Sequence, residues 1–208
     1  LTNFARQRSV GLRALALDDD DVLVSTAITT GDCDVMLFSS EGKVARFHED
    51  KVRAMGRTAR GVRGISLGAG HTMISLIIPA EEGRVLTASA NGYGKRTLVT
   101  EFPSKGRGNK GVIAMVTSER NGDLVGAVQV FEGDELMLIS NQGTMVRTRA
   151  DEISVLGRNT QGVRVIRTKE GEVLVGVERI VEPDPELLFD EEGNVIPTDH
   201  SDSQTGEE

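Results

Sequence analysis

The stretch VMLFSSEGKVARF at residues 35–47 decides the fold, because two short apolar runs flank a polar turn that ends at Gly42. Both runs have the length and composition of strands, so the stretch predicts a β-hairpin. The same pattern returns as VLTASANGYGKRT at residues 85–97 and as LMLISNQGTMVRT at residues 136–148. The sequence therefore predicts a hairpin that is repeated along the chain.

Glycines mark the period of this repeat. The three turn glycines lie 50 or 51 residues apart, and each is followed nineteen residues later by a glycine of a second series. The first series is Gly42, Gly92 and Gly143, and the second is Gly11, Gly61, Gly111 and Gly162. The chain thus divides into a half unit at residues 1–30, three full units at 31–83, 84–133 and 134–181, and a tail at 182–208.

Each full unit contains four apolar runs and no segment with a sustained helical period. In the first full unit the expected strands are Val35 to Ser39, Lys43 to Phe47, Val62 to Leu67 and Met73 to Ile78. Four strands in about 50 residues is typical of a propeller blade. We therefore expect an all-β, propeller-like fold of about three and a half four-stranded blades, and we interpret the chain as a fragment.

Charge is segregated by position in the repeat. The formal charge is -8, but the tail carries ten acids and no base, which leaves residues 1–181 at +2. The stretches 1–13, 42–63, 92–111 and 143–164 hold nineteen of the 24 Lys and Arg residues and only five acids, a net charge of +14. A repeated fold would place these stretches at intervals along one curved rim.

Such a rim suits a curved polyanion, and double-stranded DNA fits it best because aromatic residues for base stacking are scarce. Glycines beside the bases let backbone N–H groups approach phosphate oxygens. For Arg46, Arg96 and Arg147, which lie on strands, the alternative is that they cap carbonyl groups or pair with acids of a neighbouring blade. The predicted DNA-contacting residues are Arg6, Arg8, Lys43, Arg46, Arg53, Arg57, Arg60, Arg63, Lys95, Arg96, Lys105, Arg107, Lys110, Arg147 and Arg158.

Other chemistries find little support in the sequence. The stretch at residues 106–111 matches G-x-G-x-x-G, but an expected strand follows it where a dinucleotide site needs a helix. The single tyrosine, Tyr93, has no neighbouring base or metal site to make it a nucleophile. Cys33 and the three histidines lack the spacing of a metal site. We expect no catalytic residue, metal or cofactor, no membrane partner, and a cytoplasmic protein.

The strings NGYGKRT at residues 91–97, GRNTQGV at 157–163 and VRAMG at 52–56 resemble the C-terminal domain of the bacterial DNA gyrase A protein. The resemblance covers residues 1 to about 181, and the acidic tail also fits it. It implies a six-bladed β-pinwheel, a propeller variant whose blades exchange strands and whose outer perimeter binds and wraps DNA. The parent enzyme would be an ATP-hydrolysing type II topoisomerase, an isomerase that introduces negative supercoils in the cytoplasm, near the nucleoid.

The resemblance also implies partners that lie outside the chain. These are the catalytic core of the gyrase A protein and the gyrase B protein, which would form an A2B2 heterotetramer that uses Mg²⁺ and ATP. The resemblance also implies that the catalytic tyrosine and the glycine-rich basic box of the first blade lie outside the chain. The fragment itself would be a non-catalytic DNA-binding domain. The alternatives are the equivalent domain of topoisomerase IV and a protein-interaction propeller. The tail is expected to be disordered and to compete with DNA for the basic rim.

Overall fold

The computed structural model describes residues 9–180, 188–189 and 195–196. Arg6, Arg8 and most of the acidic tail, with the hypothesis that the tail competes with DNA, lie outside the described residues. Within the tail, strands β12 and β13 pair with each other. The strands are β1 Asp34–Ser39, β2 Lys43–His48, β3 Met73–Ile77, β4 Arg84–Ser89, β5 Tyr93–Leu98, β6 Val112–Ile113, β7 Leu124–Val130, β8 Glu135–Ser140, β9 Met145–Arg149, β10 Val163–Arg164, β11 Leu174–Ile180, β12 Leu188–Phe189 and β13 Val195–Ile196.

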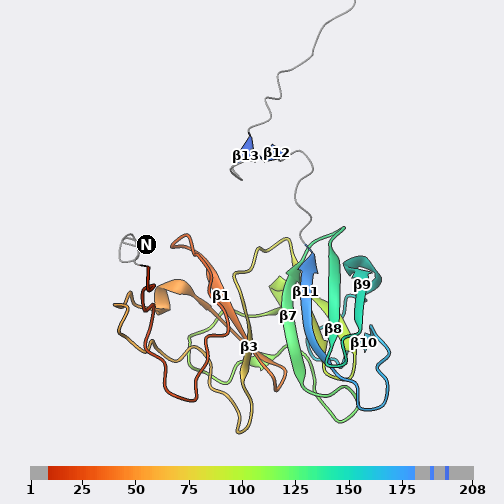
Figure 1. The fold of residues 1–208 in the computed structure, drawn as a ribbon. Coiled ribbons are helices and arrows are strands. Elements are labelled where there is room, and N and C mark those ends of the chain that lie inside the picture. Colours follow the sequence, from red (N-terminus) through yellow and green to blue (C-terminus); the bar gives the residue numbers. More distant parts are fainter. Residues whose placement is uncertain (1–8, 181–187, 190–194, 197–208) are drawn as a thin grey trace, which may run out of the picture.

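The full units form three antiparallel sheets, which we call blades (Figure 1). Blade 1 has the strand order β3-β1-β2-β6, blade 2 the order β10-β5-β4-β7, and blade 3 the order β11-β8-β9. A single turn of 3-10 helix follows the second hairpin strand of each unit. These turns are η2 at Glu49–Lys51, η3 at Val99–Glu101 and η4 at Ala150–Glu152.

Each four-stranded blade takes its outermost strand from the following unit. β6 belongs to the second full unit but pairs with β2, and β10 belongs to the third full unit but pairs with β5. The strand predicted for Val62 to Leu67 is therefore not found, and within that segment only Ile65 forms an isolated bridge, to Asn109 of the second full unit. The reason is strand exchange: the segment is the counterpart of β6 and β10, which pair with the preceding blade.

The two glycine series mark contacts between successive units. Gly92 has a φ of +78°, and a Cβ atom there would lie 2.5 Å from the carbonyl oxygen of Ile166 in the next unit. The carbonyl of Gly92 accepts hydrogen bonds from the N–H groups of Val165 and Ile166. Gly162 has a φ of +76°, and a Cβ atom would lie 2.6 Å from the carbonyl oxygen of Gly94. At these two positions only glycine combines a positive φ with so close an approach, and the positive φ is shared by every glycine of the two series.

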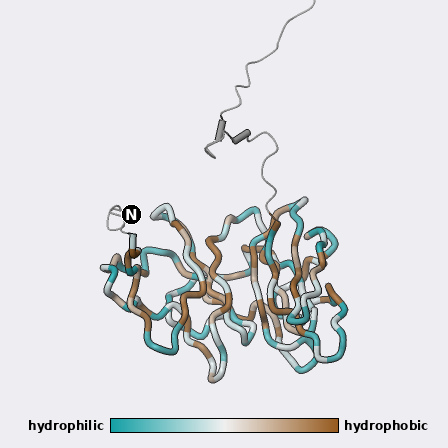
Figure 2. The backbone as a smooth tube through the Cα atoms, viewed as in Figure 1, coloured by the Kyte–Doolittle hydropathy of each residue, from teal (hydrophilic) through white to brown (hydrophobic). Residues whose placement is uncertain are grey.

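The hydrophobic core lies between blades, because successive side chains of a strand point to opposite faces. Met36 and Phe38 of β1 pack in one cluster with Val85 of β4, whereas Leu86 packs in a second cluster with residues of blade 3. Phe38 also meets Phe102 edge to face at 6.5 Å. Figure 2 shows the hydrophobic colour concentrated along the strands and the hydrophilic colour on the connecting turns.

The inner strands surround a common cavity of about 340 Å³. The same repeat position of all four units lines it, including Val24 and Ser25 of the half unit. The units are therefore arranged around one axis, with β3, β7 and β11 innermost and β6 and β10 at the perimeter. Within the described part of the chain, no helix has the length and apolar character of a membrane span.

Candidate nucleic-acid interface

In each of the three full units, one arginine of the basic loop makes the same contact. This arginine lies four residues before the second-series glycine and donates from Nη1 to a carbonyl oxygen of the preceding unit. The repeated contact fixes one side of each guanidinium group, and the planar group has further N–H donors for an outside acceptor. The three hydrogen bonds, each of 3.2 Å, join Arg57 to Arg13, Arg107 to Arg63, and Arg158 to Ile113.

These three arginines, which we call the arginine row, stand beside the perimeter strands. The carbonyl that binds Arg158 belongs to Ile113 of β6, the outermost strand of blade 1. Arg107 is exposed, and Arg57 and Arg158 are half-buried. Arg107 makes a second contact from Nε to the carbonyl of Lys51 at 2.8 Å. The row therefore presents one oriented guanidinium group per unit along the outer edge.

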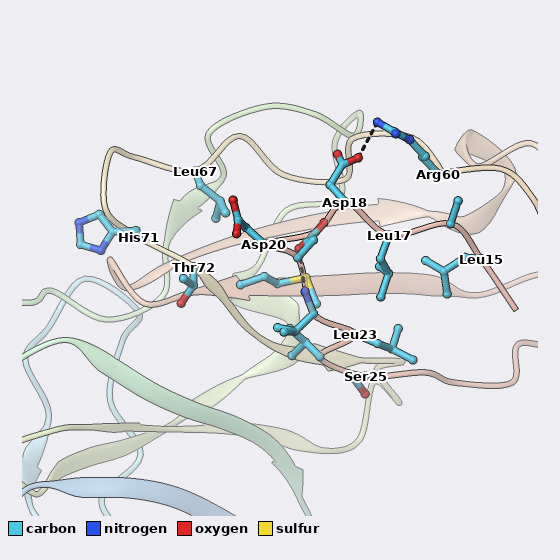
Figure 3. Close-up of a pocket in the computed structure, with 15 residues that line it drawn as sticks. Leu15, Leu17, Asp18, Asp20, Leu23, Ser25, Arg60, Leu67, His71 and Thr72 are labelled. Atoms are coloured by element: carbon cyan, nitrogen blue, oxygen red, sulfur yellow. Dashed lines mark hydrogen bonds and ion pairs between the residues drawn. The ribbon is translucent and has the colours of Figure 1, made fainter. Parts of the chain in front are cut away.

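Other predicted bases of the loops are exposed beside the row. Arg53, Arg63, Lys105 and Lys110 are all exposed. Arg60 is exposed too, and its Nη1 atom lies 2.6 Å from Oδ1 of Asp18 in the half unit (Figure 3). That pair lies at the edge of a cavity of about 430 Å³ between the half unit and the first full unit. Because both side chains are well exposed, water screens the pair and leaves Arg60 able to exchange partners.

Arg46 joins blade 1 to the second full unit. Its side chain is 11% exposed, and its Nε atom lies 2.6 Å from Oδ2 of Asp34. Its Nη1 atom donates to the carbonyls of Val99 and Phe102, and its Nη2 atom pairs with Glu81. We call this contact, between the second hairpin strand and the following unit's 3-10 turn and loop, the inter-blade seam.

Arg96 repeats this arrangement between blade 2 and the third full unit. The residue is 8% exposed, and its Nε atom donates to the carbonyl of Ile153 at 2.7 Å. Its Nη2 atom donates to the carbonyl of Asp151 at 3.2 Å. The alternative that strand arginines cap carbonyls of the neighbouring blade is thus what the structure shows for Arg46 and Arg96.

Lys95 is fully buried in the same seam. Its Nζ atom donates to the carbonyls of Gly157 and Arg158, at 2.7 and 2.6 Å, and to the hydroxyl of Thr160 at 3.1 Å. Burial lowers the pKa of Lys95 to about 8, against an opposing effect of the Glu101 carboxylate and with a smaller contribution from the positive charge of Arg158. The lysine thereby fixes the loop that carries Arg158. Because protein oxygens already occupy their donors, we leave Arg46, Lys95 and Arg96 out of the DNA contacts proposed below.

The two other predicted strand bases form local ion pairs. Nζ of Lys43 lies 2.9 Å from Oε2 of Glu41, and Arg147 pairs with Glu135 on the neighbouring strand. The sequence reasoning left out several exposed bases. Two of them have a detectable signal, because Arg13 and Arg164 each follow a second-series glycine by two residues, as Arg63 does.

Comparison with known families follows the same units. Residues 1–30, 34–80, 83–130 and 134–180 match the family described as "DNA gyrase C-terminal domain, beta-propeller". The chain belongs to the DNA gyrase C-terminal domain family. The DNA gyrase A protein of Pseudomonas aeruginosa is 60% identical over 183 residues, which cover 88% of this chain and 20% of that protein. The Escherichia coli protein is 55% identical over 183 residues, which cover 88% of this chain and 21% of that protein.

Solved structures agree with this family and fold. A gyrase A C-terminal domain superposes with a TM-score of 0.75 and 29% identity, covering 83% of this chain and 59% of that one. The C-terminal domain of a DNA topoisomerase IV gives 0.80 and 23% identity, over 86% and 56%. The predicted family and the predicted all-β pinwheel-like fold are confirmed. The chain spans about a fifth of the length of its curated gyrase relatives.

Proposed function

We propose that the chain binds double-stranded DNA without base recognition and bends it around its outer perimeter. The observation that carries the proposal is the arginine row, in which one guanidinium group per unit is oriented by the same carbonyl contact. Arginine binds phosphate oxygens with paired N–H donors. A row with the period of the blades would place successive phosphate contacts along a curved path.

The parent protein supplies the purpose of this binding. As the C-terminal part of the gyrase A protein, the domain would wrap the DNA that is passed through a double-strand break, in a cycle that requires Mg²⁺ and ATP hydrolysis in the gyrase B protein. The A2B2 complex would thereby introduce negative supercoils in the bacterial cytoplasm, close to the nucleoid. The domain itself would contribute no catalytic group.

Phosphate contacts have to offset the stiffness of the duplex. Bending a site of 20 to 30 base pairs by 40° to 90° costs on the order of 1 to 6 kcal/mol. The loop bases exposed beside the row, such as Lys105 and Lys110, can add contacts that offset this cost. Because contacts to phosphates carry no base information, affinity should depend little on sequence.

The direct test uses two linear duplexes of equal length and unrelated sequence, each labelled at its ends for energy transfer. We expect similar affinities for both in a mobility-shift assay, and closer ends in the bound state. The triple variant Arg57→Gln, Arg107→Gln, Arg158→Gln should weaken binding to both duplexes, and circular dichroism checks its fold. Absence of binding at low salt, or strong preference for one sequence, would contradict the proposal. Ends that stay apart would contradict bending.

A further inference from the structure

Two arginines outside the arginine row meet on the single tyrosine of the chain. The Tyr93 hydroxyl accepts a hydrogen bond from Nη2 of Arg164 at 2.9 Å and one from Nε of Arg120 at 3.3 Å. The guanidinium carbons lie 5.1 and 5.0 Å from the centre of the Tyr93 ring. The ring is buried, at 4% exposed, whereas both arginines are exposed. A rigid base therefore holds two positive groups at the surface.

This cluster lies at the perimeter and is built by two units. Arg164 belongs to β10, the outermost strand of blade 2, and stands directly opposite Tyr93 of β5. Arg120 comes from the loop that joins β6 to β7 in the second full unit. The cluster therefore forms only where strand exchange brings the third full unit onto blade 2.

Charge balance within the described residues points to an outside anion. Neither Arg120 nor Arg164 forms an ion pair with a carboxylate there, unlike Arg46, Arg60 and Arg96. The shared hydroxyl keeps the two like charges close, and their repulsion favours an anion that binds both. Arg164 and then Arg120 lower the pKa of the Tyr93 hydroxyl through their hydrogen bonds.

The loop that carries Arg120 also contacts the basic loop of the third full unit. Gln161 stands at the repeat position that Arg60 and Lys110 occupy in the other units. Its side chain donates to the hydroxyl of Ser118, and its carbonyl accepts from Asn121. Arg120 therefore supplies a positive charge beside the loop in which the repeat has lost one.

We propose that Arg120 and Arg164, held on Tyr93, form a phosphate clamp that binds a backbone phosphate of duplex DNA at the outer edge of blade 2. Guanidinium groups match phosphate geometry with paired donors, and two of them can grip adjacent oxygens of one phosphodiester. This inference rests on the proposed DNA binding and adds a specific contact to it.

The first test is a duplex affinity measurement over a range of salt concentrations with Arg120→Gln/Arg164→Gln. Loss of one phosphate contact should reduce the slope of log affinity against log salt by about 0.9. Affinity at moderate salt should fall about tenfold. The control Arg149→Gln/Arg167→Gln removes two charges from exposed arginines outside the clamp, Arg149 being paired with Asp151. An equal loss in the control would overturn the clamp.

The second test uses the fact that Tyr93 is the only tyrosine in a chain without tryptophan. Near-ultraviolet absorbance then reports ionisation of Tyr93 alone. Inorganic phosphate in the clamp should neutralise the guanidinium charges and raise the pKa of Tyr93 relative to chloride at equal ionic strength. Arg120→Gln/Arg164→Gln should abolish this phosphate effect. A pKa that is the same in both salts would count against the clamp.

The outcomes separate the clamp from the proposed function. If the wild-type chain binds DNA with a steep salt slope and the double variant matches it, the clamp is wrong and general DNA binding stands. If the wild-type chain binds no duplex DNA, both proposals fail. Tyr93→Phe keeps the buried ring and removes the shared acceptor, so it should give a partial loss of DNA affinity; unchanged affinity would show that the hydroxyl does not position the arginines.

Discussion

The second and third full units carry the same repeat but differ in what covers their outer edge. In blade 2, β10 of the following unit pairs with β5, and the turn glycine, Gly92, is in close contact with Ile166. In blade 3, β9 is the edge strand among the described residues, and a Cβ atom at Gly143 would meet nothing within 4 Å. Similar hairpins are therefore held very differently.

The difference shows that the contacts that stabilise each hairpin are made largely with the following unit. Arg96 is buried against the following unit, whereas its counterpart Arg147 is half exposed and pairs with Glu135 on its own blade. Lys95 is likewise buried against the following loop, and Val146 holds its place in the third full unit. Pairs of equivalent residues therefore provide matched variants with different expected effects.

The largest expected difference is between the two turn glycines. Gly92→Ala combines a positive φ with a Cβ atom 2.5 Å from the Ile166 carbonyl oxygen, whereas Gly143→Ala has only a positive φ. We expect the free energy of unfolding to fall by about 3 to 4 kcal/mol for Gly92→Ala and by about 1 kcal/mol for Gly143→Ala. Urea unfolding monitored by circular dichroism measures both. Equal losses would show that the close approach is not what requires glycine.

The strand arginines should differ next. Arg96→Met leaves the carbonyls of Ile153 and Asp151 without their donor and should lower the free energy of unfolding by about 3 kcal/mol. Arg147→Met removes a half-exposed ion pair and should cost no more than about 1 kcal/mol. The same urea experiment compares them. If Arg147→Met lowered the free energy of unfolding as much as Arg96→Met, the inter-blade seam would be no more stabilising than the contacts of the edge strand.

Lys95 should make the stability contributed by the inter-blade seam depend on pH. Its pKa is about 8 in the folded chain and returns towards 10.5 on unfolding, so above pH 8 the unfolded chain holds more protons and stability rises with pH. Relative to Lys95→Met, the wild-type free energy of unfolding should increase by about 1.5 kcal/mol between about pH 8 and about pH 9.5. A difference that is constant with pH would show that the ammonium is not desolvated.

The smallest expected difference concerns DNA affinity. Lys110 is exposed in the basic loop of the second full unit, and Gln161 occupies the same repeat position in the third full unit. Lys110→Gln should weaken duplex binding roughly threefold and Gln161→Lys should tighten it by a similar factor, because each changes about one phosphate contact. Fluorescence anisotropy at fixed salt measures both. If both variants changed the duplex affinity in the same direction, or neither changed it, this repeat position would not contact a phosphate in both loops.

The repeat and its fold could be predicted from the sequence, because the glycine series and the hairpin pattern are visible in a single chain. Strand exchange could not be derived from the strand pattern alone. The run from Val62 to Leu67 has the composition of a strand, and composition does not say which blade supplies its partner. A positive φ is common to all seven glycines of the two series, and the inter-unit contacts add a second requirement at positions such as Gly92 and Gly162.

The candidate site was predictable only in part. The period of the sequence predicts the arginine row, but it predicts Lys95 and Arg96 as DNA contacts too, because charge in a sequence does not reveal burial by the next unit. Arg120 gave no signal, because it stands alone beside Glu119 and has no basic counterpart in the other units. Its partner Arg164 could have been found from the repeat position that it shares with Arg63.

The most direct test of phosphate binding along the perimeter is the duplex affinity of the chain as a function of salt concentration. If six to ten phosphates are neutralised, log affinity falls linearly with log salt, and affinity drops by roughly 10³ to 10⁵ between 50 and 200 mM salt. The arginine row, the exposed loop bases and the phosphate clamp together require such a steep dependence. A duplex affinity that changes little over this range of salt would contradict phosphate binding along the perimeter.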